Sequence, residues 1–229
     1  MEFEVLDLGL TKYQNAHEKQ LELLKKRITG EIRDTLILTQ HHRVFTLGKT
    51  GHISNILVPK EKLEQENIEV VNVERGGDIT YHGPGQLVAY PIFFLPKGRR
   101  DLKSFLRLLE QSVIETAKFY QAKTCTIEGL TGVWESKTGE EHLDVWRGER
   151  KLTSMGLAFK NWVSFHGLAL NIEADLTPFS YMNLCGLVGK RPVNLRDLTN
   201  ASFTFEDVKK TLVEEIRKQV KDWLFSTLP

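Results

Sequence analysis

The clearest sign of chemistry in this sequence is a glycine-rich segment at residues 75–86, which reads Arg-Gly-Gly-Asp-Ile-Thr-Tyr-His-Gly-Pro-Gly-Gln. Glycine lets the backbone approach a ligand closely, and such a loop can present N–H groups to an anion or a carbonyl oxygen. The segment lacks the Gly-Lys-Ser/Thr ending of a phosphate P-loop and the glycine spacing of a dinucleotide-binding turn. A tight turn between strands is the simpler alternative, but Arg75, Tyr81 and His82 favour a binding segment.

A candidate nucleophile is Cys185, in the run Met-Asn-Leu-Cys-Gly. It falls within residues 178–200, which show weak periodicity, and long irregular segments inside compact domains are often functional. A free cysteine is more commonly a buried small hydrophobic residue, so the sequence alone leaves both roles open for Cys185. Cys125 lies between β-branched residues in a strand-like segment, and we expect it to pack in the core.

Lys151 opens an apolar strand that continues as Leu-Thr-Ser-Met-Gly. Such a lysine is usually a solvated strand end. If the strand enters a pocket, the ammonium group stabilises a nearby thiolate and lowers the pKa of a cysteine from its ordinary value. Desolvation would also lower the pKa of the lysine, which makes it a usable proton donor and acceptor.

The histidines do not show the spacing of a metal site. His166, in an apolar strand, and His41 are each more often satisfied core residues than ligands, and we assign no role to His17, His52 and His142. No pair has the spacing of a HExxH motif, and the two cysteines of the chain cannot form a zinc tetrad. We therefore expect neither a metal nor a cofactor.

The composition is that of an ordinary globular protein. The chain has 229 residues, a net charge of +1 and 41% hydrophobic residues, which favours one larger domain over residues 1–229. The net charge gives no argument for a nucleic-acid or membrane partner, no apolar run approaches the roughly 20 residues of a membrane span, and we expect neither partner. The N-terminus lacks the basic and apolar regions of a secretory signal, and scarce cysteines suit a reducing compartment, so we expect a cytoplasmic protein.

Strand and helix signals are mixed without a regular alternation, which predicts an α+β fold. Helical spacing and capping residues predict helices at residues 11–28, at 101–120 after Asp101, and at 204–225 after a Thr204–Asp207 capping box, with a short helix starting at Pro59. Alternating or β-branched runs predict strands at residues 3–8, 35–39, 68–73, 151–159 and 162–172. Pro91 predicts an edge strand or a bulge within the apolar run 87–95. Residues 132–135 and 143–146 are expected to be two strands around a polar turn.

Together these segments resemble the octanoyltransferase family of lipoate biosynthesis, whose members are octanoyl-[acyl carrier protein]:protein transferases. The similarity covers most of the chain. The glycine-rich segment resembles the long signature of the family, and the region from His41 to Gly48 resembles its early His-x-x-Val-x-Thr-x-Gly motif. Residues 151–156, 164–171 and 183–186 match its lysine strand, its Phe-His-Gly-Leu-Ala-Leu-Asn strand and its Asn-Pro-Cys-Gly loop.

The resemblance implies a fold shared with lipoate and biotin protein ligases: a mixed sheet flanked by helices, with a smaller sheet. It implies that Cys185 carries the acyl group as a thioester and that Lys151 lowers the pKa of that cysteine and moves the proton. The matching substrate-binding residues are Arg75, Gly76, Gly77, Asp78, Ile79, Thr80, Tyr81, His82, Ser154, Met155, Gly156, Gly167, Leu168 and Ala169. Candidate oxyanion donors are the N–H groups of Gly83, Gly85 or the Cys185 loop.

The implied donor is octanoyl-acyl carrier protein, and the implied acceptors are lipoyl domains of 2-oxoacid dehydrogenase E2 subunits and the glycine cleavage H protein. Two features depart from the family pattern: Leu184 stands where proline is usual, and the charged segment 135–150 looks extended, which suggests a long hairpin. Alternatives are an octanoyl amidotransferase acting between lipoyl-type proteins, an ATP-dependent lipoate-protein ligase, and a non-catalytic carrier-binding module. A ligase has no need of Cys185, and a binding module has little use for Cys185 and Lys151 together.

Overall fold

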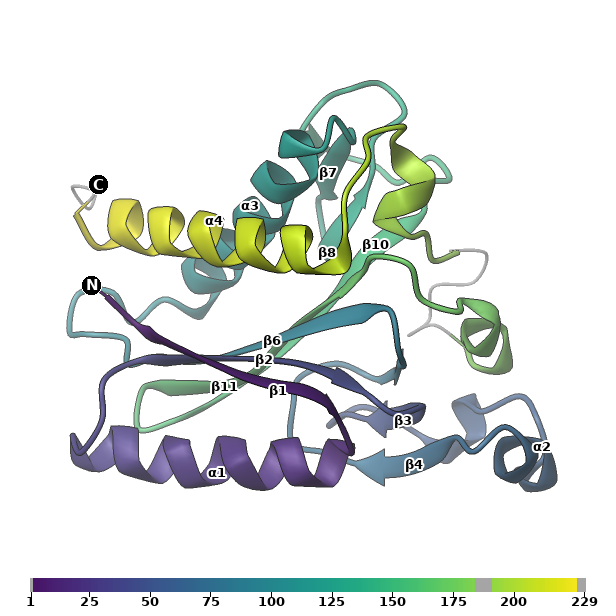
Figure 1. Ribbon diagram of the computed structural model, residues 1–229, viewed down its shortest axis with the longest axis horizontal. Helices are drawn as coiled ribbons and strands as arrows, with labels where there is room; N and C mark the ends of the chain where they lie inside the picture. Colours follow the sequence, from purple (N-terminus) through teal and green to yellow (C-terminus); the bar gives the residue numbers. More distant parts are fainter. Residues whose placement is uncertain (1, 184–190, 226–229) are drawn as a thin grey trace.

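The computed structural model describes residues 2–183 and 191–225, and it is built around a large, twisted, mixed β-sheet (Figure 1). In spatial order the eight strands are β1 (Glu4–Thr11), β2 (Thr35–His41), β6 (Gln86–Ile92), β11 (Val163–Asn171), β10 (Lys151–Lys160), β8 (Leu130–Glu135), β7 (Thr124–Ile127) and β9 (His142–Leu143). The β1–β2 and β7–β9 pairs at the two ends are parallel, and the inner pairs are antiparallel.

A smaller sheet has the order β4 (Glu69–Asn72), β3 (Val44–Leu47), β5 (Ile79–His82). A short helix, α2 (Lys60–Gln65), lies beside it (Figure 1). The core of this part is an apolar cluster that joins Phe45 and Tyr81 of the small sheet to Phe179 of a short 3₁₀ helix, Thr177–Tyr181. The expected α+β class, with a large mixed sheet and a smaller sheet, is confirmed.

Helices cover both faces of the large sheet. Helix α1 (Tyr13–Thr29) packs on one face, and α3 (Leu102–Phe119) and α4 (Phe205–Phe225) pack on the other (Figure 1). The period-2 alternation of a strand explains how β2 serves both layers: Leu36 and Leu38 join the core under α3 and α4, while Ile37 joins the core under α1. Burial on both faces requires the near-continuous apolar run that identified this strand in the sequence.

The predicted helix signals have the expected geometry. The side chain of Asp101 accepts a hydrogen bond from the Lys103 N–H at 2.9 Å at the start of α3. At the start of α4, the Asp207 N–H donates to the Thr204 hydroxyl at 3.2 Å, and the Thr204 N–H donates to the Asp207 carboxylate at 2.9 Å. These bonds satisfy N–H groups that a helix start otherwise leaves unpaired. Across the described residues, we find no helix with the length and apolar character needed to cross a bilayer.

Two expectations about strand placement are wrong in part. Pro91 is not at an edge, because β6 lies between β2 and β11. The β2–β6 ladder runs through the Leu36–Pro91 pair without a register shift, whereas pairing of β6 with β11 ends at Ala89, and His166 on β11 has a left-handed φ of 57°. Proline can therefore occupy an interior strand here, because the ladder with β11 is already interrupted beside it.

The charged segment 135–150 does not form a long hairpin. Both edges of β8 are already occupied, by β7 and by β10, so β9 pairs with the far edge of β7 instead. The Thr126–His142 and Ile127–Leu143 pairs of this parallel ladder extend the sheet by one short strand. The Arg150 guanidinium binds the Glu135 carboxylate at 2.8 Å, which closes the base of the segment.

Candidate functional site

A cavity with about 620 Å³ of empty space lies where the middle of the large sheet meets the small sheet. The space inside it that a water-sized group can occupy is smaller, about 70 Å³. Its walls come from the glycine-rich segment, from β10 and β11, and from the start of α1. The lining residues are Tyr13, Arg75, Gly77, Asp78, Ile79, Thr80, His82, Val88, Tyr90, Lys151, Ser154, Met155, Gly156, His166, Gly167, Leu168 and Ala169.

Most of the residues proposed from the sequence to bind substrate line this cavity; the two exceptions are Gly76 and Tyr81. Gly76 borders a neighbouring groove. The ring of Tyr81 packs edge-to-face against Phe45 and Phe179 in the core of the small sheet, and burial raises the pKa of its phenol to about 12. Cys185 lies outside the described residues. The alternation of side chains along strand β5 explains why Tyr81 differs from its neighbours. The side chains of Thr80 and His82 point to the face of the strand opposite to that of Tyr81.

Arg75 is the buried cation of the cavity, with 8% of its surface exposed. Its guanidinium donates to the Thr46 backbone oxygen at 2.6 Å and to the Thr46 hydroxyl at 2.9 Å. Glycines make room for it: a Cβ on Gly48 would stand 2.9 Å from the guanidinium, and one on Gly156 would stand 3.1 Å from its Cδ. The absence of a side chain at Gly156 on β10 therefore leaves the space that Arg75 of the glycine-rich segment occupies.

A chain of buried amides connects His82 to Asn171 at the end of β11 and to the Val193 backbone. The His82 Nδ1–H donates to Gln86 at 2.7 Å, Gln86 donates to the Asn171 side chain at 2.8 Å, and Asn171 donates to the Val193 backbone oxygen at 3.3 Å. Burial lowers the pKa of His82 to about 3, aided by the nearby His41. The imidazole is therefore neutral at pH 7, with a tautomer fixed by Gln86.

Lys151 marks one end of the cavity, which we call the lysine end. Its Nζ lies 4.9 Å from the centroid of the Trp134 ring, a cation–π geometry, and its side chain also borders the neighbouring groove. Gly132 on β8 gives this side chain its space, since a Cβ there would stand 2.9 Å from the Lys151 Cε and 2.3 Å from the Thr153 backbone oxygen. The buried carboxylate of Glu110 accepts the Gly132 N–H at 2.8 Å. Sequence analysis did not identify Gly132. Its position beside Lys151 follows from the pairing of β8 with β10.

The described residues that flank 184–190 are fixed beside the same cavity. The Asn183 N–H donates to the Asn55 backbone oxygen at 2.8 Å, and the Asn55 amide donates to the Asp78 carboxylate at 2.7 and 2.8 Å. On the other flank, the Lys151 N–H donates to the Arg191 backbone oxygen at 2.7 Å. Asp78 and Lys151 both line the cavity. Asn183 and Arg191, the described residues on either side of 184–190, are therefore both bonded to the cavity wall.

The opposite end, which we call the histidine end, is formed by Tyr13, Tyr90 and His166, with His41 behind them. Strand residues rise about 3.3 Å each, so His166, paired with Leu157, lies roughly 20 Å along β10 from Lys151. The His41 Nε2 accepts a hydrogen bond from the Tyr90 hydroxyl at 2.8 Å. Burial lowers the pKa of His41 and of His166 to about 4. Neither Tyr13 nor Tyr90 was identified from the sequence, because no spacing links the start of α1 to β6.

One candidate oxyanion donor is excluded. The Gly85 N–H donates to the Gln40 side chain at 2.8 Å, and a Cβ on Gly85 would stand 2.6 Å from the Glu173 backbone oxygen. This N–H is committed to the turn and does not face the cavity as a free donor. Gly85 keeps a left-handed φ of 82° for that turn.

Cys125 is a core residue, as predicted. Its surface is fully buried, and its thiol donates to the Glu135 backbone oxygen at 3.4 Å. Burial raises the pKa of this thiol to about 12, and the nearby carboxylate of Glu149 adds to the shift. The thiol stays protonated at pH 7, which makes Cys125 a poor nucleophile.

A larger, open groove with about 1400 Å³ of empty space continues from the lysine end. It shares Lys151, Met155 and Gly156 with the cavity, and it is bordered by apolar side chains of α3, β8 and β10: Leu102, Leu106, Leu130, Leu157 and Phe159. The groove is open at the surface and reaches Lys151.

Comparisons with known proteins identify the family and the fold. The family model "Lipoyl protein ligase A/B catalytic domain" matches residues 12–217. An octanoyltransferase of Syntrophotalea carbinolica is 38% identical over 221 residues, which is 96% of each chain, and one of Dictyoglomus turgidum is 43% identical over 87% of this chain and 79% of its own. The bi-partite lipoate protein ligase of Thermoplasma acidophilum shares the fold with a TM-score of 0.72, at 15% identity, over 96% of this chain and 84% of that one.

Proposed function

Because this chain belongs to the octanoyltransferases of the lipoyl protein ligase A/B catalytic-domain family, we propose that it transfers octanoyl from octanoyl-acyl carrier protein to a lysine of a lipoyl domain. The proposed acceptors are the E2 subunits of 2-oxoacid dehydrogenases and the glycine cleavage H protein. The structure of the archaeal lipoate ligase was described together with its E2 lipoyl domain, which supports a lipoyl domain as the acceptor. We propose the cytoplasm as the location and residues 1–229 as one catalytic domain.

In the first half-reaction, the Cys185 thiolate attacks the thioester carbonyl of the donor. The carrier thiolate leaves, takes a proton, and an octanoyl thioester remains on Cys185. One thioester is exchanged for another, so the step needs no ATP. The Lys151 ammonium stabilises the attacking thiolate and then supplies the proton to the leaving thiol.

In the second half-reaction, the acceptor lysine loses a proton to Lys151 and attacks the enzyme thioester. An amide forms and the Cys185 thiol is regenerated. The acyl chain is proposed to extend from the lysine end toward the histidine end, between Val88, Ala169 and Met155. Each buried methylene contributes about 0.8 kcal/mol, so chain length is recognised through the fit of the cavity.

The observation that supports this proposal is that both described flanks of residues 184–190 are bonded to the cavity lining, one of them directly to Lys151. A Lys151 N–H···Arg191 hydrogen bond of 2.7 Å and the Asn183–Asn55–Asp78 connection bring the ends of that segment to the cavity wall. In the sequence only Leu184 separates Cys185 from Asn183.

Intact-protein mass spectrometry after incubation with octanoyl-carrier protein, without ATP, tests the proposal. We expect an adduct of one octanoyl group that is absent in Cys185→Ala and retained in Cys125→Ser. The acylated enzyme, freed of donor, should then modify a lipoyl domain.

Two outcomes would replace the proposal. If no adduct forms, but free octanoate and ATP together modify a lipoyl domain, the protein is a ligase. If octanoyl-lipoyl-protein acylates Cys185 and octanoyl-carrier protein does not, it is an amidotransferase acting between lipoyl-type proteins.

A further inference from the structure

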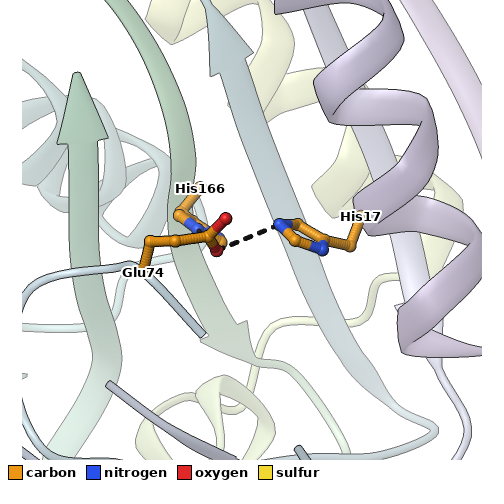
Figure 2. A group of neighbouring side chains, drawn as sticks. All are labelled: His17, Glu74 and His166. Carbon is orange, nitrogen blue, oxygen red and sulfur yellow. Dashed lines mark ion pairs between the residues drawn. The ribbon is translucent and has the colours of Figure 1, made fainter. Parts of the chain in front are cut away.

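We propose that His17, Glu74 and His166 form a binding site for one divalent transition-metal ion of the Zn²⁺ type, next to the histidine end of the cavity. The three residues come from separate elements: α1, the loop that follows β4, and β11. Figure 2 shows the Glu74 carboxylate between the two imidazoles. This proposal departs from the sequence-based expectation of no metal, which considered only ligands close together in the sequence. It does not depend on the proposed octanoyl transfer.

The two distances from the Glu74 carboxylate to the imidazoles match those of a tetrahedral ion. The Glu74 Oε2 lies 3.1 Å from the His17 Nε2 and 3.4 Å from the His166 Nε2, and the ligand atoms all lie within 4.8 Å of one another. Zinc bonds to nitrogen and oxygen of about 2.0–2.1 Å place neighbouring atoms of a tetrahedron roughly 3.3 Å apart. Two histidines and one glutamate are also a ligand set that zinc uses with a water in the fourth position.

The imidazole of His166 is almost completely buried, with 1% of its surface exposed. Among the described residues, neither the His17 Nε2 nor the His166 Nε2 has a hydrogen-bond partner. Both nitrogens approach the Glu74 oxygen without the direction that an N–H···O bond requires, whereas lone pairs that meet at a shared ion need no such direction.

Neighbouring residues orient His166 in the way that hydrogen-bond partners orient a metal-binding histidine. Its Nδ1 lies 3.4 Å from the Tyr13 hydroxyl, so the Nδ1–H can face that oxygen and leave Nε2 free to bind. Its backbone N–H donates to the side chain of Gln20 at 2.8 Å, and Gln20 lies one turn after His17 on α1. The unusual φ of 57° at His166 is therefore fixed by the same helix that supplies the second histidine.

The site is accessible from solvent on one side. The Glu74 side chain is 48% exposed and that of His17 is 14% exposed, so an ion can enter at the carboxylate and leave a position for water. Glu74 directly precedes Arg75. A bound ion would therefore link α1 and β11 to the start of the glycine-rich segment.

The test is competition for Zn²⁺ between a chromogenic chelator and the full chain, without a histidine tag and with Cys185→Ser to remove a competing thiolate. We expect one Zn²⁺ per chain, bound at about micromolar concentration or tighter, and a thermal midpoint raised by Zn²⁺ but not by Mg²⁺. His17→Ala should weaken binding at least about tenfold. Glu74→Gln should do the same, and because Glu74 is half exposed it keeps the test valid should His17→Ala fail to fold.

His142→Ala is the matched control. The His142 Nε2 lies 3.9 Å from the carboxylates of both Glu128 and Asp144, on the surface, so it represents an ordinary histidine–carboxylate cluster. Its replacement should leave Zn²⁺ affinity unchanged. The proposal fails if no saturable site is found, if folded Glu74→Gln binds Zn²⁺ as tightly as the parent, or if His142→Ala removes the binding.

Discussion

The two ends of the cavity differ in the protonation of their basic side chains. At the lysine end, the Lys151 ammonium lies over the face of Trp134 at the opening into the large groove. At the histidine end, burial lowers the pKa values of His41 and His166 to about 4, and beside it burial lowers the pKa of His82 to about 3, so these rings are neutral at pH 7. One cavity therefore keeps an ammonium where a thiolate is proposed to form, and neutral imidazoles close to the buried Arg75 guanidinium at its other end.

The largest effect should come from removing the charge of the lysine end. We expect Lys151→Ala to fold but to lose octanoyl transfer at least about 100-fold, because the proposed thiolate and proton shuttle lose their cation. The measurement is kcat/KM for a lipoyl domain, together with iodoacetamide labelling of Cys185 across pH. The control is Lys160→Ala, an exposed lysine at the other end of β10. An unchanged apparent pKa of Cys185 in Lys151→Ala would contradict the assignment.

Crowding the lysine end without changing its charge should have a smaller effect. Gly132→Ala places a methyl group against the Lys151 Cε and the Thr153 backbone oxygen, so we expect about 1–3 kcal/mol of lost stability with reduced transfer. Gly129→Ala is the control: both glycines have positive φ, 109° and 74°, but a Cβ at Gly129 meets nothing within 4 Å. Equal losses in denaturant melts of the two variants would mean that backbone strain, not contact with Lys151, causes the effect.

The histidine end predicts how stability depends on pH. A buried histidine with a folded pKa near 3 and an unfolded pKa near 6.5 binds its proton more readily in the unfolded chain. Its contribution to stability is therefore present above about pH 6.5 and is lost as the pH falls toward the folded value. We expect His82→Gln to reduce the slope of unfolding free energy against pH by up to about 1.4 kcal/mol per unit between pH 6 and 4. The exposed His52, replaced by Gln, is the control.

The smallest expected effect concerns the wall between the two ends. Ala169 pairs with Val88 across the β6–β11 ladder, and both line the cavity. Ala169→Val should shift preference from octanoyl toward hexanoyl donors by a few-fold, since one buried methylene is worth about 0.8 kcal/mol. Competition between the two donors, read by mass spectrometry, measures the shift. Ala201→Val, on a segment away from the cavity, should not change the ratio.

Features confined to one segment were predictable from the sequence. The spacing of apolar residues and the Asp101 and Thr204 caps identified α3 and α4, and the glycine-rich segment identified the wall of the cavity. Such signals are local, because a cap, a strand period or a glycine turn acts within a few residues.

Features that depend on which strands become neighbours were not predictable in the same way. The position of β9 beyond β7 depends on both edges of β8 being occupied. Tyr90 joins the site because β6 pairs with β11, and His17 meets Glu74 because α1 crosses the sheet above β11. Periodicity within a segment carries no information on these long-range contacts.

The β7–β9 ladder at the outer end of the large sheet has a practical consequence. Residues 137–140 form an exposed turn just before β9, and the Arg150–Glu135 bonds close the base of that segment before Lys151 begins β10. An exposed loop tip fastened at its base tolerates inserted sequence, because the added chain has no buried backbone to disturb. This turn is thus a permissive position for splicing in an affinity epitope or a fluorescent reporter, which would allow the chain to be followed while both termini stay native.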